Sequence, residues 1–281
     1  MKRRGNQKNF FATFTIYVLV ALLMLFVLFP FAWMLSTALK SPEEQFKIPP
    51  TLLPSVPTLH NFSSVLHHSM FIDYFLNSLL IASATTLLVI IVTLFSAYSF
   101  SRLTFPGRKM SSCLIIFSQL FPLAAIIVPI YGVMSTIGLI NTRFSLVIAN
   151  FSFTVPISVW LLRGFLEGIP YELEEAAMID GCSRLQAFLR IILPLSRPGM
   201  AATSAYIFFV SWQEFMFALT FITDEAKRTL PVGILDFVGQ YETNWGNLMA
   251  ASILICLPVF ILFMVLQRQL VAGLTKGSLK G

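Results

Sequence analysis

The sequence predicts an all-α membrane protein with six transmembrane helices and both termini in the cytoplasm. Of its 281 residues, 57% are hydrophobic and only 11% are charged, and the mean hydropathy is +0.81. Soluble domains carry about a quarter charged residues, so this composition excludes an ordinary soluble protein. Long apolar runs and an uneven distribution of basic residues support the same class.

Six apolar runs have the length that a membrane-spanning helix needs, which is about 20 residues. The first, at 10–36, follows the basic segment 1–9 and lacks the small-residue cleavage site of a secretory signal, so we expect an uncleaved first span. A core domain at 75–266 contains the other five. They are expected at 75–100, 112–134, 144–162, 200–222 and 248–266. Pro122 and Pro129 should kink the third span.

The basic residues decide the orientation of these spans. Fourteen of the 19 Lys and Arg residues lie in segments that this arrangement places in the cytoplasm, and five lie outside. Because positive charge favours the cytoplasmic side, the N-terminus and the tail at 267–281 are both expected inside. Because the basic residues lie beside apolar runs, the net positive charge does not indicate binding to nucleic acid.

Residues 37–74 are expected to form an external loop. Five prolines favour extended or turn backbone there, with one short helix near 59–68. His60, His67 and His68 lie in this loop without the further ligands of a metal site, so we expect solvated histidines and no bound metal.

A loop at 164–199 carries five of the thirteen acidic residues and therefore cannot lie in hydrocarbon. Pro170 suits the first turn of a helix, and Gly181 is placed to end it. Three acids complement the helix dipole in that first turn. They are Glu172, Glu174 and Glu175. Helical spacing gives this helix a shared face of small and mixed residues. Its members are Leu173, Ala176, Ala177 and Asp180.

A second helix is expected to begin at Ser183, with Gln186 completing a capping box. Pro194 and Pro198 are expected to end it. The pair of helices would lie outside the membrane as a docking surface for another protein. The alternative is an amphipathic helix that rests on lipid headgroups, which the three acids disfavour.

The loop contains a spaced motif, E-A-A, three residues, Gly, nine residues, Ile, one residue and Leu-Pro. In residues and spacing it resembles the hallmark loop of permease subunits in bacterial binding-protein-dependent ABC importers. The resemblance implies a type I ABC importer permease fold, in which the segment 171–194 docks on an ATPase subunit. The ATPase-coupling residues that it implies are Glu175, Ala176, Ala177, Asp180, Gly181, Leu193 and Pro194.

Further stretches look like the carbohydrate-importing, maltose-type branch of this family. They are 71–79, 96–109, 212–220 and the C-terminal 269–281. Gln213 stands where family members often have Asn, which keeps the site polar. The resemblance also implies that the tail contacts the ATPases. The tail residues concerned are Gly273, Leu274, Thr275 and Lys276.

Polar side chains inside the expected spans are candidates for a substrate pathway. Glu214 is the only acid well inside a span, and a charge there is costly unless it faces the protein interior or a cavity. One interpretation places it in a polar pathway for hydroxyl-rich ligands; the other makes it a structural contact to a partner helix. The candidate pathway residues are Gln119, Asn150, Trp212, Gln213 and Glu214.

The sequence has no G-x-x-x-x-G-K-[ST] loop and no catalytic constellation, so we expect a transport subunit and no enzyme. No cofactor is expected in this chain, and ATP and Mg would be bound by a partner ATPase. The resemblance implies a second homologous permease, two ATPase subunits, an extracytoplasmic sugar-binding protein and membrane lipid as partners, in the bacterial inner membrane.

The expected function is half of the translocation pathway of an ATP-driven sugar importer. One alternative is the same machine with another cargo, such as glycerol-phosphate, a polyol or an amino acid. An ion-coupled secondary transporter is a further alternative, although the sparse charge inside the spans argues against it. A membrane enzyme would need catalytic polar residues grouped at one interface, and the sequence shows none.

Overall fold

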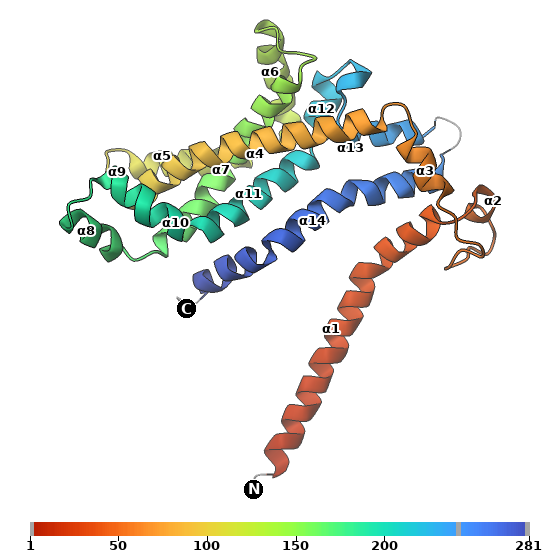
Figure 1. Ribbon diagram of the computed structural model, residues 1–281, viewed down its shortest axis with the longest axis horizontal. Coiled ribbons are helices and arrows are strands. Elements are labelled where there is room, and N and C mark those ends of the chain that lie inside the picture. Colours follow the sequence, from red (N-terminus) through yellow and green to blue (C-terminus); the bar gives the residue numbers. More distant parts are fainter. Residues whose placement is uncertain (1–2, 240–242, 279–281) are drawn as a thin grey trace. The chain divides into compact units, whose positions relative to one another are not determined.

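The computed structural model describes residues 3–239 and 243–278. Every regular element in these residues is helical, apart from an isolated bridge between Val238 and Thr243. The chain forms two compact units, Met1–His68 with Ile234–Leu254, and Ser69–Gly233 with Ile255–Gly281. Figure 1 shows the order of the helices along the chain.

The first unit contains the long helix α1 (Arg3–Ala38) and the short helices α2 (Pro42–Gln45), α3 (His60–Leu66) and η4 (Ile234–Phe237), with the start of α14 (Trp245–Ser278). The span Thr13–Ala38 contains an apolar window with a mean hydropathy of 2.7, and residues 13–32 are all exposed, whereas Ser36, Thr37 and Ala38 at its end are buried. Such a helix offers its whole circumference to lipid or to other chains.

The proline-rich segment folds back on the end of α1. The side-chain amide of Asn61 donates to the carbonyls of Ala38 and Lys40, at 2.8 and 2.9 Å. The buried Lys40 ammonium donates to the Thr51 carbonyl and lies 4.9 Å from the Trp33 ring centroid. The short helix expected near 59–68 is confirmed as α3.

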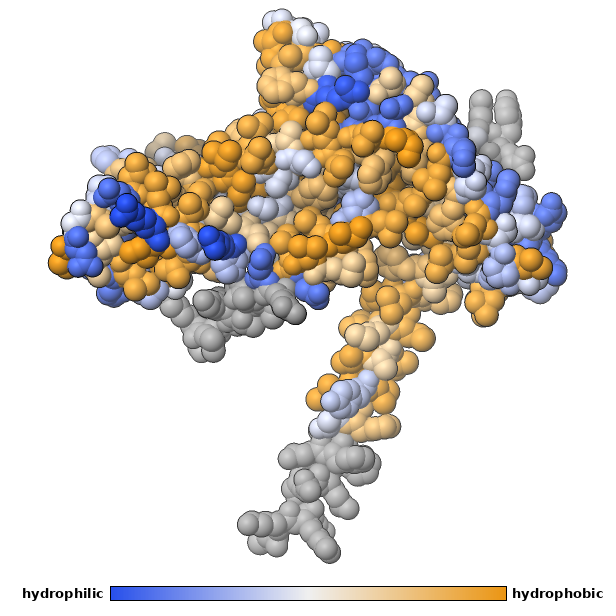
Figure 2. All heavy atoms as spheres, in the orientation of Figure 1, coloured by the Kyte–Doolittle hydropathy of each residue, from blue (hydrophilic) through white to orange (hydrophobic). Residues whose placement is uncertain are grey.

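Three helices form the centre of the second unit. They are α4 (Phe71–Arg102), α7 (Arg143–Glu167) and α11 (Arg197–Trp212), which pack against one another. Their contact faces carry small or hydroxyl side chains, including the fully buried Thr85, Thr93, Thr154 and Ser158. Small side chains allow close helix contact where lipid removes the hydrophobic driving force. Figure 2 shows hydrophobic residues gathered along α4.

The third expected span is broken rather than kinked. The helix α5 (Arg108–Phe117) continues into η1 (Ser118–Leu120), and α6 (Leu123–Thr136) then leaves at an angle of 102°. Pro122 lies at the break, and Phe121 before it is extended, as the residue preceding a proline prefers. Pro129 lies inside α6 without interrupting it.

The fifth expected span is also divided. The helix α11 ends at Trp212, and α12 (Met216–Phe221) begins after a break of three residues. Only four described helices are long and apolar enough to cross a membrane, or five if the bent pair α5–α6 counts as one span. These four are Thr13–Ala38, Phe71–Arg102, Arg143–Glu167 and Trp245–Gln267.

The loop at 164–199 is helical, as expected. It contains α8 (Glu172–Ile179), α9 (Arg184–Ala187), the π-helical segment η2 (Phe188–Ile192) and α10 (Leu193–Leu195). The expectation that Pro194 and Pro198 end the second helix is wrong. Each proline instead occupies the first turn of a new helical segment, α10 or α11, where its missing N–H is not needed.

Candidate functional site

The helix α8 has a defined beginning and a defined end. Three acids stand in its first turn, as the sequence predicted. At its end, the Cys182 amide donates to the Ala177 carbonyl and the Gly181 amide donates to the Met178 carbonyl. This is the Schellman arrangement, which needs a left-handed residue, and Gly181 has φ +90°. The glycine therefore fixes the turn between α8 and α9.

The second helix begins as the sequence predicted. The Ser183 hydroxyl accepts from the Gln186 amide, and the Gln186 side chain accepts from the Ser183 amide. This capping box orients α9 directly after the glycine turn. A π-helical segment then adds a wider turn before α10, a feature that the sequence did not indicate.

The outer face of α8 is an exposed surface of mixed character. Glu175, Ala176 and Asp180 are exposed, and Ile179 is 85% exposed. The predicted shared face is divided, since Ala177 is only 5% exposed and packs inward. Leu173 on the same helix is 43% exposed, so α8 presents apolar as well as acidic side chains to its surroundings.

Leu193 and Pro194 lie beyond η2, at the far end of the loop. Leu193 is half-buried and packs on a buried apolar cluster, whereas Pro194 is exposed. Leu193 therefore anchors the loop on the apolar cluster, and Pro194 lies on the surface of the loop.

One acid of α8 has an environment that the sequence did not reveal. The Glu174 side chain is 1% exposed, and its Oε2 lies 3.6 Å from Nε of Arg102 on α4. The Tyr98 hydroxyl donates to Glu174 Oε1. The sequence carried one signal of this burial. Glu174 stands three residues before the small residue Ala177, and side chains at i and i+3 point to the same side of a helix.

The candidate pathway residues do not share one hydrogen-bonded site in the described chain. Gln119 donates to the Phe153 carbonyl at 3.3 Å, and the buried Asn150 donates to the Leu146 carbonyl at 3.0 Å. Gln119 also lines an apolar hollow of about 340 Å³ whose walls come from α5, η1 and α7. Its other lining residues are Ile116, Pro156, Ile157 and Trp160.

The remaining three candidates lie where α11 gives way to α12. Trp212 is 2% exposed and its indole N–H donates to the Ile255 carbonyl at 3.1 Å, so both the ring and its donor are engaged within the chain. Gln213 is exposed at the break. Glu214 accepts from the amides of Phe217 and Ala218, at 2.6 and 3.1 Å, and so caps the start of α12.

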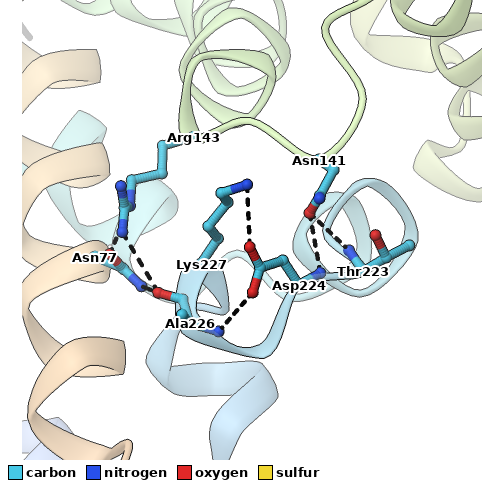
Figure 3. Close-up of polar contacts among 7 residues, drawn as sticks. All are labelled: Asn77, Asn141, Arg143, Thr223, Asp224, Ala226 and Lys227. Carbon is cyan, nitrogen blue, oxygen red and sulfur yellow. Dashed lines mark hydrogen bonds and ion pairs between the residues drawn. The ribbon is translucent and has the colours of Figure 1, made fainter.

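A polar network joins the start of α4 and α7 to the segment after α12 (Figure 3). Arg143 Nε donates to Asn77 Oδ1 at 2.7 Å. The Asn77 amide group donates to the carbonyls of Ala226 and Arg228, each at 2.9 Å. Asn77 therefore holds two parts of the chain about 150 residues apart in sequence.

Asn141 and Asp224 extend this network (Figure 3). Asn141 has φ +62°, and its side-chain oxygen accepts from the amides of Thr223 and Asp224. Asp224 accepts from the Ala226 amide and pairs with Lys227 at 3.1 Å. The Lys227 hydrogen bond, followed by that of the Ala226 amide, holds the pKa of the Asp224 carboxyl below its usual value.

The helix α14 includes the backbone of the four tail residues, which are Gly273, Leu274, Thr275 and Lys276. Their side chains fall outside the described residues, so their expected contacts stay a prediction.

Comparison with known proteins identifies the class of this chain. Residues 90–276, about two thirds of the sequence, match the family model described as binding-protein-dependent transport system inner membrane component. The chain belongs to this family. All of the loop at 164–199 lies inside the matched region, including the buried Glu174.

Relatives of this family member align over nearly their whole length. It is 34% identical to the inner membrane ABC transporter permease protein YcjP of Escherichia coli, covering 94% of this chain and 95% of the relative. It is 37% identical to the trehalose/maltose transport system permease protein MalG of Thermococcus litoralis, with coverage of 94% and 96%. It is 33% identical to the diacetylchitobiose uptake system permease protein DasC of Streptomyces coelicolor, with coverage of 94% and 96%.

The fold of this family member is shared with a solved transporter structure. A chain of a bacterial ABC transporter involved in the import of the acidic polysaccharide alginate superposes with a TM-score of 0.80 at 22% identity, covering 93% of this chain and 97% of that one. A second structure, an alginate ABC transporter in complex with an alginate-pentasaccharide-bound periplasmic protein, gives a TM-score of 0.68 at 15% identity. At these identities the likeness concerns the fold.

Proposed function

We propose that this chain is one permease subunit of an ATP-driven sugar importer and forms half of its translocation pathway. The exposed face of α8, inside the family's spaced motif, is the observation that carries this proposal. The helix exposes Glu172 and Glu175 together with the apolar Leu173 and Ile179, and a separate ATPase would cover this face. The partner also supplies the site for ATP and Mg, for which this sequence has no phosphate-binding loop.

The proposed importer has two permeases, two ATPases and an extracytoplasmic sugar-binding protein. Closure of the ATPase pair on ATP would move the segment 171–194, and the spans would then alternate between inward- and outward-open states. Glu175 would hold the docked helix to the ATPase, and Gly181 would permit the sharp turn beside it. Residues 273–276 would approach the ATPases from the tail.

In this proposal the chain crosses the bacterial inner membrane six times, with both termini in the cytoplasm. The four long apolar helices provide four crossings, and the bent pair α5–α6 provides one. The sixth is α11 together with α12, whose break resembles the discontinuous helices of other transporters, where irregular backbone lines a cavity.

Sugar is the proposed cargo. The relatives named for trehalose and maltose and for diacetylchitobiose align over 94% of the chain, which supports a hydroxyl-rich ligand. Gln213 is the first candidate contact, because it is exposed at the break. Gln119, Asn150, Trp212 and Glu214 would support the pathway walls through the contacts described above.

Gentle purification of the chain from its native membrane tests the assembly. A second permease and a P-loop ATPase should come with it, and their absence together with ATP-independent transport would overturn the proposal. Uptake into proteoliposomes then tests the cargo with labelled trehalose, maltose and diacetylchitobiose, compared with glycerol 3-phosphate and leucine. Preference for glycerol 3-phosphate or leucine would refute a sugar importer, while the proposed assembly of permeases and ATPases would still stand.

Glu175→Lys tests the docking role of α8 directly. The residue is exposed, so the variant should fold normally, while the reversed charge should lower ATPase retention about 10-fold or more. Glu172→Lys, another exposed acid of the same helix, is the matched control and should retain the ATPase. Equal retention in wild type and Glu175→Lys would remove Glu175 from the interface.

A further inference from the structure

A buried carboxylate joins the helical loop to the end of α4. Among the acidic side chains of the described residues, only Glu174 is fully buried. Its Oε2 lies 3.6 Å from Nε of Arg102, whose side chain is 6% exposed, and its Oε1 accepts from the Tyr98 hydroxyl. Tyr98 and Arg102 lie four residues apart, one turn of α4, so both face the same carboxylate.

The same guanidinium holds a third element. Nη2 of Arg102 donates to the carbonyls of Leu166 and Ile169 at 2.9 and 2.8 Å, at the end of α7 and just after it. Its Cζ lies 5.6 Å from the ring centroid of Tyr171, the residue before α8. A planar guanidinium with several fixed donors suits this geometry, and a lysine could not reproduce it.

Apolar side chains pack around Tyr98, which contacts the carboxylate, and the Glu174 side chain is only 1% exposed. The Tyr98 ring lies 4.6 Å from that of Phe188 on η2. Both belong to a cluster of buried residues, whose other members are Leu94, Ala97, Leu162, Leu166, Ile169 and Ile192. Low polarity strengthens the attraction between paired charges, and it makes an unpaired charge costly.

The two faces of α8 therefore have different partners. Glu175, Ala176 and Ile179 are exposed, whereas Glu174 and Ala177 are buried. Figure 1 shows α8 beyond the end of α4, and Arg102 is the last residue of α4. A helix that is pulled on its outer face transmits the displacement inward only if its inner face is held.

We propose that Glu174, Arg102 and Tyr98 form a rigid joint that makes α8 and α4 move as one body. They are positioning residues, and the joint carries the movement of α8 into the span α4. This inference rests on the proposed function, because it assigns the part of the chain through which an ATPase would drive the spans.

Distance measurement between spin labels tests the joint in the intact importer. The labels replace Met178 on α8 and Leu88 on α4, after Cys113, Cys182 and Cys256 have been changed to serine. Distances are recorded without nucleotide and after trapping with ATP and vanadate. In the wild-type background the distribution should stay narrow and move by less than about 2 Å, because α8 and α4 stay joined.

Glu174→Gln keeps the size of the side chain and removes its charge. It should retain the ATPase and at least half of its hydrolysis rate, while the distance shifts by several ångströms or its distribution at least doubles in width. Tyr98→Phe keeps the ring against Phe188 and should act in the same direction if Glu174→Gln folds poorly. The matched control is Glu172→Gln, an exposed acid of α8, which should behave as wild type.

The outcomes separate the joint from ordinary packing and from the proposed function. An unchanged, narrow distance in both Glu174→Gln and Tyr98→Phe would overturn the joint, as would a large nucleotide-dependent shift in wild type. The double variant should show no further change beyond Glu174→Gln, since both act on one carboxylate. If no ATPase accompanies the wild-type chain, the proposed function fails instead, and the distance in the isolated chain still reports whether the joint is rigid.

Discussion

Glu174 and Glu175 are neighbours in sequence with opposite surroundings. One carboxylate is buried between Tyr98 and Arg102, and the other is exposed on the outer face of α8. Helical geometry separates adjacent side chains by about 100°, so one turn can face both inward and outward. The sequence placed both acids in the first turn of α8, but which of them points inward depends on Arg102, about 70 residues away in sequence.

Replacement of Gly181 by valine should destabilise the turn after α8. Its φ of +90° is strained for a β-branched residue and costs about 1–2 kcal/mol, equivalent to about 5- to 30-fold in population of the native turn. Limited proteolysis of the loop should accelerate, and ATPase retention should fall. Gly164→Ala is the control, since a Cβ there meets open space and the backbone φ is not positive. Equal proteolysis of both variants would contradict the assignment.

At the scale of elements, Glu214 acts through the start of α12. It bonds to two amides that lack partners within that helix, so Glu214→Ala should cost about 1–2 kcal/mol and lower the unfolding temperature in detergent. Gln213→Ala, at the exposed neighbour, should leave that temperature unchanged. If Glu214→Ala unfolds at the wild-type temperature but raises the KM for cargo, the carboxylate belongs to the pathway rather than to the cap.

The segment after α12 should loosen in acid. The pKa of Asp224 is lowered from 3.8 by Lys227 and the Ala226 amide, so its ionised form stabilises the folded segment. This stabilisation is complete above the pKa of Asp224 in the unfolded chain, and it is lost as the pH falls through the lower pKa of Asp224 in the folded chain. Hydrogen exchange of the Ala226 amide, corrected for its intrinsic pH dependence, should therefore be steady from pH 8 to 5 and rise below about pH 4. In Asp224→Asn the Ala226 amide should exchange faster at pH 7, and the extra rise at low pH should disappear. An exchange profile equal to that of the wild type would contradict the pairing of Asp224 with Lys227 and the Ala226 amide.

Prediction from sequence succeeded where local chemistry decides the structure. Gly181 defines the end of α8 and the capping box defines the start of α9, because the hydrogen bonds of both join residues a few positions apart. Prediction missed the breaks at 121–122 and 213–215, where the flanking segments are apolar although the helix does not continue. Hydropathy reports transfer into the membrane, whereas helix continuity also depends on Pro122 and on the competing Glu214 bonds.

At the scale of the whole molecule, the topology has a direct test. Single cysteines at Val56 and Ile179, both at least 75% exposed, belong to segments proposed for opposite sides of the membrane. In cells a membrane-impermeant maleimide should label Val56→Cys and spare Ile179→Cys until the cells are opened. Variants with the three native cysteines changed to serine provide the background. The reverse labelling would invert the topology and remove the loop at 164–199 from any cytoplasmic ATPase.

The buried hydroxyl groups of α4 have a consequence for biosynthesis. Thr85 and Thr93 are buried on α4, which packs against α7 and α11, and these two helices begin 72 and 126 residues after α4 begins. The apolar α1 can enter the bilayer alone, because its residues 13–32 are all exposed. During synthesis the buried face of α4 therefore stays without its two companions until α7 and α11 arrive, and only then can the second unit close.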